Sequence, residues 1–237
     1  MEFVRTAIDG PIGTLTLDHP RKLNALSERM AEEIIQALKD FEAAGVRVAI
    51  LRAMPRVKVW SAGHDVAELP EGGRDPLGWD DPLRELVRAL ETFPAPVIAL
   101  IEGGVWGGAV ETVLACDIVI AAPEATFAVT PAKLGVPYNI SGMMTFMSAG
   151  SARIVKELAF TARPITAERA ERVGMVNHVV AAEELEAFTL EMANTIAQNS
   201  PLSIRSMKEC LRVLTGAKPV SPRGFERFQG LRRMVYD

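Results

Sequence analysis

The sequence predicts one α/β domain that ends in a helical C-terminal portion. Short apolar runs alternate with amphipathic helical patterns up to about residue 140, and helical patterns dominate after it. Neither a fixed-period repeat nor a low-complexity segment nor a clear linker divides the chain. Its 237 residues fit one large core, or one core with a small appendage.

The first elements follow from turn and capping residues. Residues 2–8 and 13–17 are predicted strands on either side of the turn Asp9-Gly10-Pro11. Ser27 is a predicted N-cap of a helix that continues to about Ala44 and is followed by Gly45. The apolar stripe of that helix comprises Met30, Ile34, Ile35, Leu38 and Phe41. Residues 46–51 and 57–60 are predicted to be extended.

The middle and end of the chain are assigned in the same way. We predict a helix over residues 82–92, a buried strand over 97–101 and a buried helix over 112–116. Short strands follow at 117–121 and 125–128, and residues 176–180 are also expected to be extended. Helical patterns begin at residues 151 and 166 and cover residues 183–199 and 201–214.

Two consecutive glycines, Gly107 and Gly108, join the buried strand to the buried helix. Glycines at such a junction let the backbone turn sharply and let a ligand approach closely. The first amides of the helix then point outward without partners, so the turn can hold a negatively charged oxygen. The alternative is a tight turn that only packs a helix on a sheet.

Composition excludes several classes of protein. The net charge is −4 and there is no long basic run, which argues against a nucleic-acid partner. The chain has neither an uninterrupted apolar run of about 20 residues nor a signal-peptide pattern, so we predict a cytoplasmic protein without membrane contact. Cys116 and Cys210 are expected to be buried free thiols. No His, Cys or Asp cluster has metal-ligand spacing, so no metal site is predicted.

Three segments together resemble the crotonase, or enoyl-CoA hydratase/isomerase, superfamily. They are residues 61–65 (Ser-Ala-Gly-His-Asp), 105–111 (Val-Trp-Gly-Gly-Ala-Val-Glu) and 127–135, supported by residues 21–26 and 174–177. The resemblance implies a spiral of ββα units over residues 1–185 that holds an acyl-CoA ligand. It also implies that residues 186–237 form a helical region used for assembly into a trimer, or into a hexamer of two trimers.

The resemblance also implies the roles of individual residues. The main-chain amides of His64 and Gly108 would hold the thioester oxygen, so the imidazole of His64 need not titrate; a general-base role for that ring is the less favoured alternative. The substrate and its CoA portion would contact Lys22, Leu23, Ala25, Ala62, Gly63, His64, Asp65, Val66, Gly107, Gly108, Glu111 and Thr130. For Lys22 the alternative is a solvated side chain, and for Asp65 a helix cap.

Departures from the superfamily pattern narrow the reaction. Hydratases use two glutamates; Glu111 occupies the first position, but Pro131 occupies the second and can neither accept a proton nor orient water. Tyr138 stands where relatives have a small turn residue. An oxyanion hole, no working base pair and one neutral phenol suit decarboxylation of a malonyl-type thioester, because that reaction needs no base. Glu111 as a merely satisfied polar group, and Tyr138 as a packing residue, are the alternatives.

Among superfamily members the chain is most similar to those that convert methylmalonyl-CoA to propionyl-CoA and CO2. This similarity implies a carbon–carbon lyase that uses no biotin, metal or redox cofactor. It also implies a further C-terminal segment, with a lysine near the CoA phosphates, beyond Val235-Tyr236-Asp237, so we expect the tail to be truncated here. The alternatives are a hydratase- or isomerase-type reaction that uses Glu111, and a catalytically silent subunit that binds CoA esters.

Overall fold

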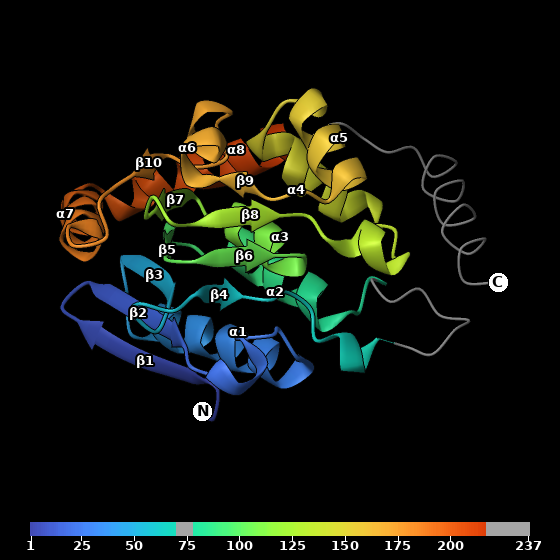
Figure 1. Cartoon of the computed structure of the whole chain (residues 1–237). Coiled ribbons are helices and arrows are strands. Elements are labelled where there is room, and N and C mark those ends of the chain that lie inside the picture. Colours follow the sequence, from blue (N-terminus) through green and yellow to red (C-terminus); the bar gives the residue numbers. More distant parts are fainter. Residues whose placement is uncertain (70–77, 217–237) are drawn as a thin grey trace.

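The computed structural model describes residues 1–69 and 78–216 and contains two sheets over these ranges (Figure 1). The six-stranded sheet has the order β1-β2-β3-β5-β7-β10, and the four-stranded sheet has the order β4-β6-β8-β9. The strands of the first are β1 (Val4–Asp9), β2 (Ile12–Leu17), β3 (Val48–Ala53), β5 (Val97–Ile101), β7 (Ile118–Ala121) and β10 (His178–Val179). Those of the second are β4 (Val59–Ser61), β6 (Gly104–Trp106), β8 (Thr126–Ala128) and β9 (Ile165–Thr166).

From β3 to β8, consecutive strands alternate between the two sheets. The pairs β3/β4, β5/β6 and β7/β8 each place one strand in each sheet, and pairing within both sheets is parallel along these units. The helices α2 (Pro82–Thr92) and α3 (Gly108–Leu114) complete the first two units, and α4 (Ile140–Ala149) follows the third after the 3-10 turn η3 (Pro131–Leu134). The predicted spiral of ββα units is therefore confirmed (Figure 1).

Most predicted helices form where local signals placed them. The helix α1 (Glu28–Ala43) begins at Ser27, whose Oγ accepts a hydrogen bond from the Met30 amide at 3.3 Å. Strand β6 and helix α4 lie in segments for which we predicted no element. The remaining helical elements are η1 (Pro20–Lys22), η2 (Val66–Glu68), α5 (Ala152–Thr161), α6 (Ala167–Arg172), α7 (Leu185–Gln198) and α8 (Pro201–Gly216).

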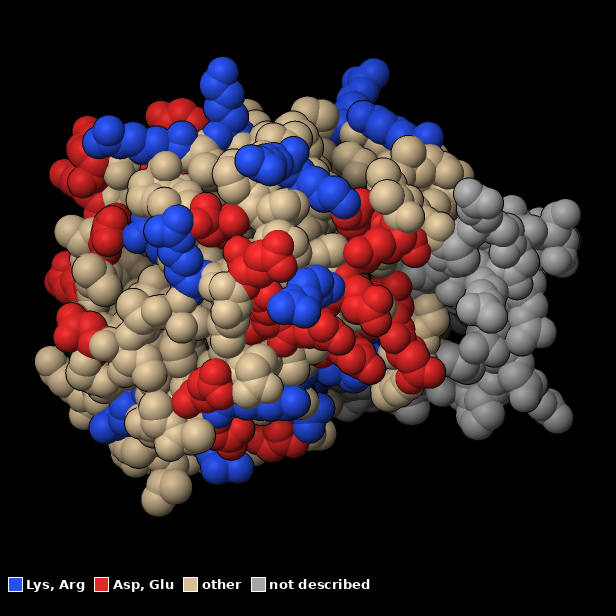
Figure 2. All heavy atoms as spheres, turned by 90° about the horizontal axis from the view of Figure 1, so that it is seen from below, with Lys and Arg blue, Asp and Glu red and all other residues tan. Residues whose placement is uncertain are grey.

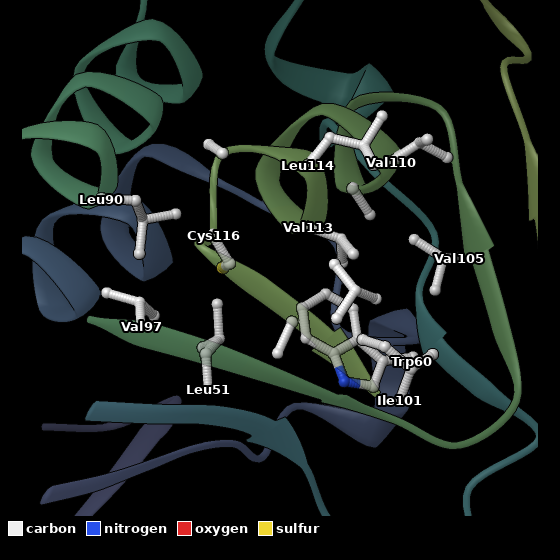
Figure 3. Close-up of a cluster of buried hydrophobic side chains, with 14 of the residues drawn as sticks. Leu51, Trp60, Leu90, Val97, Ile101, Val105, Val110, Val113, Leu114 and Cys116 are labelled. Carbon is white, nitrogen blue, oxygen red and sulfur yellow. The ribbon is translucent and has the colours of Figure 1, made fainter. Parts of the chain in front are cut away.

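The main core lies against one face of the larger sheet and includes residues of helices α1 to α3 and of the smaller sheet; Figure 3 shows part of it. Leu51 and Ile101 from the sheet lie near Val113 of α3 and the ring of Trp60, whose Nε1 donates to the carbonyl of Leu100 at 2.9 Å. Helix α7 covers the other face, where a second apolar cluster includes Ile12, Val48, Ile50, Ile98, Leu185 and Ala193. Because β3 and β5 are buried on both faces, β5 is a continuous apolar run and β3 is apolar apart from Arg52.

Helix α8 is held to the body of the molecule at its middle. Lys208 donates to the carbonyls of Leu90 and Ala95 and pairs with Asp117 at 2.6 Å. Cys210 is exposed on this helix, so the prediction of a buried thiol there is wrong; Cys116 is buried as predicted. A helical pattern alone did not show which side of α8 the body of the molecule covers.

The predictions for the C-terminal end of the chain fall outside the described ranges. They concern residues 217–237, with Val235-Tyr236-Asp237 and the expected end of the assembly region. Within the described ranges, no helix has the length and apolar character needed to cross a bilayer. Figure 2 shows acidic and basic side chains interspersed over the face seen from below.

Candidate active site

Two glycines that follow different strands bring together the segments of the predicted hole. Gly63 follows β4 with φ +90°, and Gly107 caps α3 with φ +55° and donates to the carbonyl of Ala128 at 2.8 Å. A β-carbon at Gly63 would lie 2.4 Å from the carbonyl oxygen of Trp106 and 2.8 Å from the nitrogen of Gly108. Only glycine permits this approach, so the glycines bring the end of β4 against the start of α3.

The amides of His64 and Gly108 lie close to each other. The point where a β-carbon of Gly108 would stand is 3.4 Å from the His64 nitrogen. Since that point is about 2.5 Å from its own nitrogen, the two nitrogens lie within about 6 Å of each other. One oxygen at about 2.9 Å from each nitrogen spans such a separation. Within the described ranges neither amide donates to another group, so both are available to a ligand.

The segment expected to contact CoA runs alongside residues 60–65. The amide of Ala62 donates to the carbonyl of Leu23 at 2.9 Å, and the amide of Leu26 donates to the carbonyl of Gly63 at 2.7 Å. Leu23 and Asn24 have positive φ angles of 52° and 51°, so the chain makes a tight turn at these two residues. The structure thus brings Lys22, Leu23 and Ala25 together with Ala62 through Val66.

Lys22 and Asp65 form an ion pair with 2.6 Å between Nζ and Oδ2. The hydrogen bond from Lys22 lowers the pKa of the Asp65 carboxyl, and Asp65 raises the pKa of the Lys22 ammonium. The second oxygen of Asp65 accepts from the amide of Ala67 at 3.1 Å, so Asp65 does cap the 3-10 turn η2. The side chain of Lys22 is half-exposed, and its ammonium group is paired with the buried Asp65 carboxylate.

Glu111 is fully buried one turn along α3 from Gly108. Its Oε1 is paired with the guanidinium of Arg84, which comes from α2 and is itself buried. Its Oε2 has no hydrogen-bond partner among the described residues. The carboxylate therefore faces a cation on one side and carries one unsatisfied acceptor on the other.

Tyr138 lies next to this carboxylate. A β-carbon at Gly142 would be 2.7 Å from Cδ1 of Tyr138 and 3.1 Å from Oε1 of Glu111, so both groups flank Gly142. The ring packs edge-on against Phe146 with 5.2 Å between centroids. The hydroxyl is buried and, within the described part of the chain, without a hydrogen-bond partner. Burial raises the pKa of the phenol, so it stays neutral and can donate.

Thr130 also reaches the glycine turn. Its Oγ1 lies 3.0 Å from the point where a β-carbon of Gly107 would stand. Val66 is exposed at the outer end of the 61–66 segment. Thr130 therefore lies beside the glycine turn that precedes the amide of Gly108.

Three residues of this site were not predicted, and all belong to the start of α2. Asp81 Oδ2 lies 3.1 Å from Nε2 of His64, and Cδ2 of Leu83 lies 2.6 Å from the β-carbon point of Gly108. Arg84 completes the set by pairing with Glu111. The signals in the sequence were an Asp-Pro helix start and an arginine within the apolar stripe of α2, whose other members are Leu83, Leu86, Val87 and Leu90.

The described residues contain no group of three or more His, Cys, Asp or Glu side chains that can hold a metal ion. What the site offers is a set of hydrogen-bond donors: two free amides and one buried neutral phenol. Such a set suits a reaction in which negative charge develops on an oxygen atom.

Comparison with known proteins gives consistent matches over nearly the whole chain. Residues 7–227 match the enoyl-CoA hydratase/isomerase family. The chain is 49% identical to methylmalonyl-CoA decarboxylase of Escherichia coli (strain K12) over 236 residues, which is 100% of this chain and 90% of that protein. It is 34% identical to carnitinyl-CoA dehydratase of Salmonella arizonae over 89% of this chain and 80% of that protein.

Solved structures give the same picture. A methylmalonyl-CoA decarboxylase in complex with 2-nitronate-propionyl-CoA superposes with a TM-score of 0.97 at 49% identity, covering 99% of this chain and 90% of the other. A complex with 2S-carboxypropyl-CoA matches with the same score, identity and coverage. Both of these structures contain a bound CoA derivative.

Proposed function

The chain belongs to the enoyl-CoA hydratase/isomerase family, and we propose that it is a carbon–carbon lyase that decarboxylates methylmalonyl-CoA to propionyl-CoA and CO2. Identity of 49% over the full chain to a protein of that activity supports the assignment. The observation in the site that carries it is the buried Tyr138 hydroxyl, which has no hydrogen-bond partner in the described residues and lies beside a glutamate already paired with arginine.

In this reaction the bond between the α-carbon and the carboxylate breaks. The electron pair moves toward the thioester carbonyl, whose oxygen becomes that of an enolate, and the α-carbon then takes a proton from water or an acid. The amides of His64 and Gly108 donate to that oxygen. Loss of one such donor in other enzymes costs about 3–4 kcal/mol of transition-state stabilisation.

Tyr138 would act on the other end of the breaking bond. The bond must stand perpendicular to the thioester plane for its electrons to enter the carbonyl π system. A neutral phenol held in place by Phe146 can donate one hydrogen bond to the substrate carboxylate and fix that orientation. The unpartnered hydroxyl is consistent with a partner that arrives with the substrate.

Hydration is disfavoured by the partners of Glu111. A general base needs a free carboxylate, but Arg84 holds Oε1 of Glu111 within the protein. Pro131 occupies the position at which hydratases carry the second glutamate. It begins η3, and its side chain can neither donate nor accept a proton. The one feature that favours a hydratase-type route is Oε2 of Glu111, which has no partner among the described residues.

Mass spectrometry of two substrates tests the proposal. The protein is incubated separately with methylmalonyl-CoA and with crotonyl-CoA. Loss of CO2 from methylmalonyl-CoA is the expected result. Addition of water to crotonyl-CoA without any decarboxylation would replace the proposal with a hydratase, and binding of both esters without turnover would indicate a silent CoA-ester-binding subunit.

The proposed steps call on no metal, biotin or redox cofactor, because the hole takes the charge directly. We expect the rate to be unchanged after dialysis against a chelator and after addition of avidin. A loss of rate in either treatment that returns with a metal or with biotin would contradict this part of the proposal.

We also propose that the chain self-associates into a trimer, or into a hexamer of two trimers. Support comes from α8, which leaves large apolar side chains exposed in the single chain: Leu202, Met207, Leu211, Val213 and Leu214. Exposed apolar surface of this kind is typical of protein–protein contacts. Light scattering coupled to gel filtration measures the mass directly, and a monomer at micromolar concentration would refute the proposal.

A further inference from the structure

Both ring nitrogens of His64 face oxygen atoms that can only accept hydrogen bonds. Nε2 lies 3.1 Å from Oδ2 of Asp81, and Nδ1 lies 3.1 Å from the main-chain carbonyl oxygen of Asp65. A neutral imidazole carries one N–H and would leave one of these contacts without a proton. Both contacts are satisfied only when the ring is doubly protonated and positively charged.

The surroundings of the ring favour the same charge state. The side chains of His64 and Asp81 are only 14% and 10% exposed, so water screens their interaction weakly. Burial alone lowers the pKa of His64, but the hydrogen bond and charge of Asp81 outweigh it and raise that pKa above its usual value. Glu68 of η2 adds to the increase, and the nearby Lys22 is paired with Asp65.

One carboxylate connects this ring to helix α2. Oδ1 of Asp81 accepts from the amide of Leu83 at 2.9 Å and so caps the helix, while Oδ2 contacts His64. Leu83 in turn packs on Gly108. The start of α2 therefore contacts both residues whose amides are directed at the proposed thioester oxygen.

We infer that Asp81 is a positioning residue: it holds the His64 ring as a cation against the start of α2, which fixes the direction of the His64 amide and places a positive charge beside the developing enolate. The inference rests on the proposed decarboxylation. Because the amide and the ring belong to the same residue, a ring fixed by Asp81 limits rotation of the backbone that carries the amide. The positive charge stabilises negative charge on the nearby oxygen.

The variant Asp81→Asn tests the inference with little disturbance of the helix. Asparagine has the same size and is as good an N-cap as aspartate, but it carries no charge to stabilise the imidazolium. We expect kcat to fall about 10-fold, less than the 10²–10³-fold loss typical of a whole missing hole donor. KM should stay within about twofold, because the CoA segment keeps its contacts.

The pH profile separates this role from a merely structural one. The imidazolium is lost as pH rises through the pKa of His64, so the fall of kcat at high pH should move to lower pH in Asp81→Asn. Asp80→Asn is the matched control: it removes the same charge from the exposed neighbouring residue, and we expect its profile to overlie that of the wild type. Equal profiles for both variants would refute the positioning role.

Nuclear magnetic resonance tests the pairing without reference to any activity. The chain has three histidines, so the His64 ring signals can be assigned with a His64→Gln sample. We expect the His64 titration midpoint to lie lower in Asp81→Asn than in the wild type and Asp80→Asn; equal midpoints would overturn the inference. If the midpoint moves but the wild type releases no CO2, the proposed function fails and the pairing stands. Should Asp81→Asn not fold, Asp81→Ser keeps a capping oxygen and gives the same comparison.

Discussion

Gly63→Ala should abolish turnover by closing the hole. The added methyl would lie 2.4 Å from the carbonyl oxygen of Trp106 and 2.8 Å from the nitrogen of Gly108, both of them backbone atoms. No side-chain rotation relieves these contacts, so β4 and α3 must move apart. The Gly108 amide then either is covered by the methyl or loses its direction, and the proposed enolate loses one of its two donors.

The magnitude has two parts that a control can separate. A non-glycine residue in the left-handed region costs about 1–2 kcal/mol, and Gly63 has φ +90°. Gly135 has φ +69° with nothing within 4 Å of its β-carbon point, so Gly135→Ala carries the strain without the contact. For a chain of this size 1 kcal/mol shifts Tm by about 2–4 °C. Loss of the donor adds a drop of about 10²–10³-fold in kcat.

The assay measures kcat from the release of propionyl-CoA and Tm from circular dichroism for both variants. We expect Gly135→Ala to lose a few degrees of Tm and to keep its kcat, and Gly63→Ala to lose at least 100-fold in kcat by the same reasoning. If Gly63→Ala folds and retains kcat near that of the wild type, the Gly108 amide is not a hole donor, and the proposed mechanism fails.

Three further substitutions test the Tyr138 phenol, the buried Arg84–Glu111 ion pair and the Glu33 carboxylate, which accepts hydrogen bonds from the N-terminal amides. Tyr138→Phe should lower kcat by about 10-fold or more while the Kd for CoA esters, measured by calorimetry, stays unchanged; an unchanged kcat would remove the phenol from the reaction. Arg84→Leu should lower the free energy of unfolding by about 3–5 kcal/mol because Glu111 is left buried and unpaired, and Arg84→Leu/Glu111→Leu should recover most of it in urea titrations; a double variant no more stable than the single one would contradict this. Burial alone would raise the pKa of Glu33, but hydrogen bonds from the amides of Glu2 and Phe3 and from Arg29 lower it. The contribution of the Glu33 carboxylate to stability is therefore present above about pH 4 and is lost as pH falls through its lowered pKa. The difference in unfolding free energy between wild type and Glu33→Gln should shrink in acid. A difference independent of pH would refute this role of Glu33.

Elements with strong local signals were predicted well because their causes are local. Ser27 caps α1 through its own Oγ, and α2 runs over the predicted residues 82–92 because Pro82 follows the capping Asp81. Strand β6 was not predicted because its three residues, Gly104 to Trp106, are too few to show a period. Cys210 was placed wrongly because the apolar pattern of α8 does not reveal which of its faces meets the body of the molecule.

The candidate site divides in the same way. The resemblance to the superfamily predicts that the amides of His64 and Gly108 are the donors, and these roles stay a prediction. The sequence itself shows glycines just after strands, which indicate close approaches of the backbone. It did not identify Asp81, Leu83 or Arg84, because these come from a helix whose start lies 17 or more residues from His64, and contacts over that separation depend on how α2 docks.

By itself the sequence determined the alternation of strands and helices, the glycine turn, the family and the missing second carboxylate at Pro131. Only the tertiary structure decided that Glu111 is held by Arg84 and that the Tyr138 hydroxyl is buried without a partner among the described residues. It alone also decided that the His64 ring contacts Asp81. The physical reason is that the charge state of a side chain and its unused hydrogen-bonding groups depend on its neighbours in space. Those neighbours come from elements that are distant in the chain and meet only through packing.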